Sequence, residues 1–258
     1  MIAGGDSFVY GSELKDCVDE SNQEQASKLT FTALIAKELD MEYICTAMPG
    51  YSNSAIRRTV IDACETHNDI GMVLVQWSFT SRYEFKFGYE YANWKQVSAW
   101  LTEEDPIKHL KNRFFNSNDI ILERHSKYLE YERLLGVTEF AKIFYKYLHP
   151  TQEKYTTLSE MLMLQQYLEL KQIPYLFTIA DSDLCSLFSS TDNYDASLIN
   201  LKNLVNQKYL MYFPNNLGFW QWAINNKFPI GTTHPLEEAH LEAAHIVYEH
   251  LRYIGRLP

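Results

Sequence analysis

Short apolar runs bounded by turn residues alternate along the chain with longer segments whose apolar residues recur at helical spacing. Apolar runs of this length are typical of strands buried in a parallel sheet. We expect five strands, at residues 1–4, 42–48, 71–77, 174–180 and 209–213.

The segments between these runs predict helices. Residues 27–40 have a helical apolar pattern, and residues 52–67 begin with the candidate cap residues Ser52 and Ser54. Further helices are expected over 156–172, capped by Thr157 or Ser159, and over 235–255, opened by Pro235. Alternating strands and helices predict a three-layer α/β/α sandwich with a mainly parallel sheet of about five strands, whose functional residues lie at the carboxyl ends of the strands.

One segment interrupts the alternation. Residues 82–155 are too many for one crossover and are rich in Tyr, Phe, Trp and Lys. We expect residues 1–258 to form a single domain in which this segment is a mostly helical insertion. Because the insertion leaves the sheet at its carboxyl edge, we expect it to cover part of the active-site cleft and to influence substrate choice.

Composition and charge exclude several classes of protein. The chain has 46% hydrophobic residues, 22% charged residues and a formal net charge of -10, which fits a globular protein and argues against a nucleic-acid binder. No stretch approaches the roughly 18 apolar residues of a membrane span, and the first residues do not have the pattern of a secretion leader, so we expect a cytoplasmic protein without a membrane segment.

Metal and cofactor sites are not indicated. The four cysteines are scattered without a C-x-x-C pair, which predicts neither a zinc site nor a disulfide framework. His240 and His245 are five residues apart on the last helix, unlike the i and i+4 pair of a zinc helix. The sequence therefore predicts no cofactor, and it contains no signal of an oligomeric state.

The clearest candidate for chemistry is the serine in "GGDSF", directly after the first predicted strand. Ser7 is either a nucleophile or a polar residue of a turn in which Asp6 or Ser7 caps a helix. A nucleophilic serine needs a base to take its proton and donors to stabilise an oxyanion. His234, in the loop before Pro235 and the last helix, is the candidate base.

Three motifs together resemble a known family. "GGDSF" near the start, "MPGYSNSAIRR" after the second strand and "THPLEEAH" before the last helix resemble blocks one, two and five of the SGNH (GDSL-like) hydrolases, in the same order. The resemblance implies a flavodoxin-like fold, covers roughly residues 1–82 and 174–253, and does not explain the insertion. It implies that Ser7 is the nucleophile and an oxyanion donor, Gly50 a second donor and His234 the general base.

The sequence departs from this family at two positions. The third strand should end in a block whose asparagine gives another oxyanion donor, but this chain reads "VQWSFTSRYEF", where Thr80 aligns best among Ser78, Thr80 and Ser81. The triad acid should lie three residues before the histidine, where this chain has Gly231. Either a backbone carbonyl orients His234, or a carboxylate after the fourth strand does.

Asp181 and Asp183 are the carboxylates that could take this place, because parallel strands end at one edge of the sheet, and Asp181 is the preferred candidate. Arg82 follows the third strand and is expected at the same edge. Its guanidinium either binds a carboxylate or phosphate on a substrate or forms a salt bridge with Glu84 or Asp6.

The resemblance implies a serine esterase that hydrolyses a small acyl ester, such as an O-acetyl group on a carbohydrate, through an acyl-enzyme. Two alternatives remain. In the first, a sugar hydroxyl replaces water and the protein is an acyltransferase. In the second, the chain is a catalytically silent relative that serves as a binding or structural module.

Overall fold

The structure is a computed structural model that describes residues 1–19, 23–87, 93–102, 136–189 and 195–256. Its centre is a parallel sheet in the order β2-β1-β3-β6, formed by Ile44–Cys45, Ile2–Gly4, Val73–Trp77 and Tyr175–Ile179. The predicted α/β architecture with a mainly parallel sheet is confirmed.

The fifth expected strand, at residues 209–213, is only a single parallel bridge between Phe177 and Leu210. The chain then turns, because Asn215 and Asn216 have left-handed backbone angles and Phe213 pairs with Leu217 across them. The described part of the sheet therefore has four strands where about five were expected, and the 3-10 helix η2 (Gln207–Tyr209) precedes the bridge.

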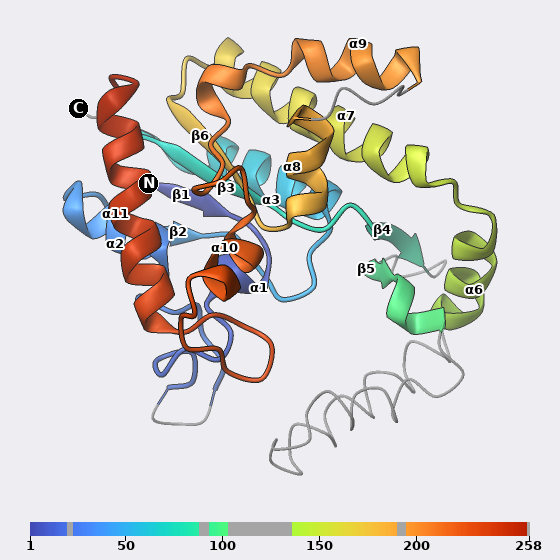
Figure 1. The fold of residues 1–258 in the computed structure, drawn as a ribbon, viewed down its shortest axis with the longest axis horizontal. Coiled ribbons are helices and arrows are strands. Elements are labelled where there is room, and N and C mark those ends of the chain that lie inside the picture. The colour runs from blue at the N-terminus through green and yellow to red at the C-terminus, as the bar shows by residue number, and fades with distance from the viewer. Residues whose placement is uncertain (20–22, 88–92, 103–135, 190–194, 257–258) are drawn as a thin grey trace.

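Helices cover both faces of the sheet, which lies between them in Figure 1. Successive strand residues point to opposite faces, so Leu74 and Leu176 pack into one core while Val73, Val75 and Phe177 pack into the other. The first core includes α2 (Phe31–Glu38), α10 (Phe219–Asn225) and α11 (Glu237–Tyr253). The second includes α3 (Asn53–Thr66), α7 (Pro150–Leu170), α8 (Ser182–Ser189) and α9 (Ala196–Leu204).

The helix starts agree with the sequence at one place and differ at another. Ser52 caps α3 as predicted, since its side chain accepts a hydrogen bond from Ala55 N. Helix α7 begins at Pro150 with His149 as its cap, earlier than expected. Thr157 lies buried inside this helix, where its hydroxyl meets the Asn53 amide at 3.0 Å.

The segment expected to be mostly helical begins with an antiparallel hairpin, β4 (Arg82–Phe87) and β5 (Asn93–Ser98). The 3-10 helix η1 (Ala99–Thr102) follows, and residues 103–135 lie outside the described part. The period-two pattern of "RYEFKF" explains the strand, because Tyr83 and Phe85 pack with Phe140 and Phe144 of α6 (Val137–Tyr147). This small aromatic core is separate from those beside the main sheet. That residues 1–258 form one domain stays a prediction.

In the segments that the structure describes, none of the helices combines the length and the apolar character needed to span a bilayer.

Candidate active site

Ser7 lies at the carboxyl edge of the sheet, where β1 ends and a single helical turn, α1 (Ser7–Tyr10), begins. The Asp6 side chain caps this turn by accepting a hydrogen bond from Phe8 N at 3.1 Å. Asp6 is fully buried and only 7% of Ser7 is exposed. The cap therefore belongs to Asp6, and Ser7 is the first residue of the turn.

The Asp6 carboxylate also contacts residues that follow β3. Ser78 Oγ donates to Asp6 Oδ2 at 2.6 Å, and an Arg82 guanidinium nitrogen donates to the same oxygen at 2.8 Å. Arg82 also meets Ser78 Oγ at 2.9 Å and lies over the Phe79 ring. Of the two roles considered for Arg82, the structure contains the salt bridge with Asp6; a contact with substrate stays a prediction.

His234 lies beside α1, in the segment between α10 and α11. Its ring meets the Phe8 ring edge-on, with 5.3 Å between the centroids, so the imidazole contacts the residue next to Ser7. His234 Nδ1 lies 2.8 Å from Thr233 Oγ1 and 2.8 Å from Glu13 Oε1. Both of these partners are at Nδ1, which leaves Nε2 as the ring nitrogen able to face a substrate or a nucleophile.

Glu13 is a residue that the sequence analysis did not single out. Its carboxylate accepts hydrogen bonds from Thr233 Oγ1 at 2.8 Å, from Thr233 N and from Thr232 N. Burial disfavours the charged form of this group, but the hydrogen bond and charge of His234, together with Thr233, lower the pKa of Glu13 below its ordinary value. No local motif marks Glu13, since it stands 221 residues before the histidine.

Asp181, the carboxylate expected to orient His234, has other contacts. It follows β6, and its Oδ1 accepts a hydrogen bond from Asp183 N at 2.7 Å, at the start of α8. Burial raises the pKa of Asp181, the nearby charge of Asp183 acts in the same direction, and the hydrogen bond from Asp183 N opposes them. The structure thus pairs His234 with Glu13 and places Asp181 at the start of a helix.

Gly50 lies in a tight turn after β2. Tyr51 N donates to Met48 O at 3.2 Å, and Gly50 has a φ of 81°, as the third residue of a Pro-Gly turn requires. Glycine adopts this angle without the steric cost that a side chain would bring. A Cβ at this position would meet no atom within 4 Å, so space does not demand glycine here and the backbone angle does.

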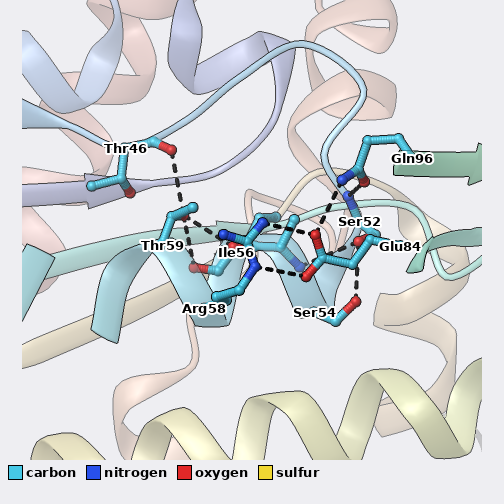
Figure 2. A network of polar contacts seen from close by, with 9 residues as sticks. Thr46, Ser52, Ser54, Ile56, Arg58, Thr59, Glu84 and Gln96 are labelled. Carbon is cyan, nitrogen blue, oxygen red and sulfur yellow. Dashed lines mark hydrogen bonds and ion pairs between the residues drawn. The ribbon is translucent and has the colours of Figure 1, made fainter. Parts of the chain in front are cut away.

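The hairpin holds the residues that follow this turn. Gln96 Oε1 of β5 accepts a hydrogen bond from Ser52 N at 2.8 Å, and Gln96 Nε2 donates to Glu84 Oε2 of β4 at 3.3 Å. Arg58 of α3 binds both oxygens of the same carboxylate, at 3.1 and 2.8 Å, as Figure 2 shows. The insertion is therefore connected through a polar network to the segment that carries Gly50.

The residues that follow β3 are engaged in hydrogen bonds of their own. Thr80 Oγ1 lies 3.5 Å from Glu153 Oε2. Ser78 donates its N–H to Asn53 Oδ1 at 2.8 Å and its hydroxyl to Asp6. Thr80 as an oxyanion donor stays a prediction.

Metal-binding side chains do not gather within the described ranges, which contain no group of three or more His, Cys, Asp or Glu able to hold an ion.

A surface hollow of about 470 Å³ lies between α2 and α11, and its walls include Leu34, Lys37, Leu241 and His245. None of the predicted site residues lines it.

No family model and no curated protein matches the sequence. Among solved structures, the psychrotrophic esterase EstA from Pseudoalteromonas sp. is similar, with 11% identity and a TM-score of 0.46 over 98% of this chain and 96% of that protein. The acetyl xylan esterase Est2A from the rumen bacterium Butyrivibrio proteoclasticus has 12% identity and a TM-score of 0.49 over 99% of this chain and 64% of its own.

A third structure, the acetyl xylan esterase AlAXEase, has 10% identity and a TM-score of 0.43 over 96% of this chain and 97% of its own. All three of these proteins are named as esterases. All three TM-scores lie below 0.5, so these similarities by themselves do not assign a function to this chain.

Proposed function

We propose that the chain is a serine esterase that cleaves a short acyl ester, such as an O-acetyl group on a carbohydrate. One observation carries the proposal. The His234 ring rests against Phe8, beside Ser7, while Nδ1 of the same ring is bound to Thr233 and Glu13. The proposal takes Nε2 of this ring to face Ser7 Oγ, because a histidine held at one nitrogen and hydrogen-bonded to a serine through the other is the arrangement that activates a hydroxyl.

The reaction has two halves. In the first, Ser7 Oγ attacks the acyl carbonyl carbon and passes its proton to His234 Nε2, and the alcohol then leaves with that proton. In the second, water attacks the acyl-enzyme, gives a proton to the imidazole and releases the carboxylic acid, and the proton returns to Ser7. The products are one alcohol and one carboxylic acid, and no co-reactant besides water is needed.

Stabilisation of the oxyanion is assigned to backbone N–H groups. Ser7 begins α1, so its N–H has no partner within the helix, and the Asp6 cap accepts from Phe8 N instead. Gly50 N–H is proposed as the second donor and Thr80 as the third. Arg82, whose guanidinium already neutralises Asp6 beside the nucleophile, is proposed to contact the substrate at the edge of the site.

Labelling with a fluorophosphonate probe, read by intact mass, tests the proposal. We expect the wild-type protein to gain one adduct, and the variants Ser7→Ala and His234→Ala to gain none. His245→Ala is the matched control, because this exposed histidine lies on α11 away from Ser7 and its loss should leave labelling unchanged.

Turnover assays distinguish an esterase from an acyltransferase and from a silent binding module. Labelling together with hydrolysis of p-nitrophenyl acetate supports the esterase, and acetylated xylo-oligosaccharides then test the carbohydrate class. Labelling with acyl transfer to an added sugar but without hydrolysis would point to an acyltransferase. A folded wild-type protein that takes up no probe would overturn the proposal and favour a silent binding module.

A further inference from the structure

We propose that Glu13, from the loop after α1, is the carboxylate that sets the tautomer and orientation of His234. The inference rests on the proposed function, because it assigns a positioning residue to the same site. It goes beyond that proposal by placing the third member of the site in a part of the chain that no motif marks.

The hydrogen bonds around Glu13 determine which nitrogen of His234 is protonated. An ionised carboxylate only accepts hydrogen bonds, and Glu13 Oε1 meets both Thr233 Oγ1 and His234 Nδ1 at 2.8 Å. The Thr233 hydroxyl has one proton, and it is donated to Glu13. Nδ1 must then donate its own proton to Glu13, so in the neutral imidazole Nε2 has the free lone pair that a general base needs.

The space around residue 231 supports the same assignment. A Cβ built on Gly231 would overlap Oε2 of Glu13, so the carboxylate occupies the room that any side chain at this position would enter. Gly231 does not have the left-handed backbone angle that would itself call for glycine. A side chain at position 231 would therefore displace the Glu13 carboxylate from its place beside His234.

The backbone conformation of the loop after α1 positions the Glu13 carboxylate. Gly11 ends the helical turn in the left-handed conformation, where a side chain would collide with Ser27 and Thr30. Glu13 itself has a φ of 71°, an unusual conformation for a non-glycine residue that neighbouring contacts must maintain. Lys15 N donates to Glu237 Oε1 at 2.9 Å, which ties the same loop to the start of α11.

The tautomer can be observed without any substrate. In ¹⁵N NMR spectra of the neutral imidazole, we expect the wild-type His234 to have a protonated Nδ1 and an unprotonated Nε2. In Glu13→Gln the side-chain amide can donate to Nδ1, so the proton should move to Nε2. A wild-type His234 already protonated at Nε2 would contradict the assignment, whatever the activity of the protein.

Kinetics with p-nitrophenyl acetate provide the second test. We expect Glu13→Gln and Glu13→Ala to lower kcat by about 10⁴-fold with little change in KM, the scale seen when a triad carboxylate is lost. Glu237→Ala is the matched control, because it removes the hydrogen bond by which α11 holds the same loop, without touching His234. Equal losses of kcat in Glu13→Ala and Glu237→Ala would reduce Glu13 to a structural role.

A carboxylate placed at residue 231 in the Glu13→Ala variant provides a third test. In Glu13→Ala the space beside Gly231 is open, so adding Gly231→Asp should recover at least about tenfold of the lost kcat. Gly231→Asp alone should lower activity, since its side chain meets Glu13. Full activity in Glu13→Ala together with an inactive Ser7→Ala would overturn this inference and leave the proposed esterase function in place. An active Ser7→Ala would overturn the proposed esterase function, while the NMR result on Glu13 would still stand.

Discussion

The residue next to the candidate nucleophile is a buried carboxylate with three donors. Asp6 accepts from Phe8 N, Ser78 Oγ and Arg82, and it is fully buried. A buried charge is tolerated in a protein only when hydrogen bonds and an opposite charge replace its hydration. At this scale, Asp6 is a structural junction between the end of β1 and the start of β4.

Removing its cation should therefore be costly. We expect Arg82→Met to lower the free energy of unfolding by about 3 kcal/mol, because Asp6 would stay buried without its counter-charge. Urea denaturation at pH 7 measures the change. Arg252→Met removes a weak, exposed pair with Glu249 at 3.9 Å and should cost less than about 0.5 kcal/mol. Similar losses in the two variants would argue against the junction.

At the scale of elements, the hairpin β4–β5 is hydrogen-bonded to α3 and to the segment that follows the Gly50 turn. Gln96 joins it to Ser52, at the start of α3 and next to the Gly50 turn, while Arg58 and Glu84 join the same helix to β4 (Figure 2). The hairpin, α3 and the turn thus share one set of hydrogen bonds. Their positions should change together.

Breaking that set at one residue should affect both stability and rate. We expect Gln96→Ala to lower the free energy of unfolding by about 1 kcal/mol and kcat on p-nitrophenyl acetate by about tenfold, because the turn that carries Gly50, the proposed oxyanion donor, loses its support. Gln152→Ala, which removes a bond to Thr156 on the exposed side of α7, is the control. An unchanged kcat would mean that the turn keeps its position without the hairpin.

At the scale of the whole molecule, a buried histidine joins two helices on one face of the sheet. His240 of α11 accepts a hydrogen bond at Nδ1 from Phe31 N, at the start of α2, and stacks on the Phe31 ring. Burial lowers the pKa of His240 from 6.5 to about 3, and the nearby His234 acts in the same direction. The folded protein therefore keeps this ring neutral at pH values where the unfolded chain protonates it.

The sign of the pH effect follows from proton binding. Between about pH 3 and 6.5 the unfolded chain binds more protons at His240 than the folded protein, so stability falls as the pH drops below 6.5. His240→Asn keeps an acceptor for Phe31 N but does not titrate. From pH 7 to pH 5, urea denaturation should show wild-type stability falling more steeply, by up to about 1.4 kcal/mol per pH unit from this group. Parallel curves would contradict the prediction.

The local pattern of the sequence determined much of this protein. Apolar runs located the four strands of the parallel sheet, Ser52 marked the start of α3, and turn residues placed Ser7, Gly50 and His234 after strands or before helices. These features depend on neighbours a few residues away, through helical periodicity, capping and turn geometry, and a sequence displays such neighbours directly.

Only the tertiary structure decided which side chains meet. The partner of His234 is Glu13, 221 residues away, while Asp181 remains at the start of α8 and Arg82 binds Asp6. The expected fifth strand is a single bridge because the turn after it pairs Phe213 with Leu217. Such contacts depend on how whole elements pack against one another, and for them the separation of two residues along the chain contains no information.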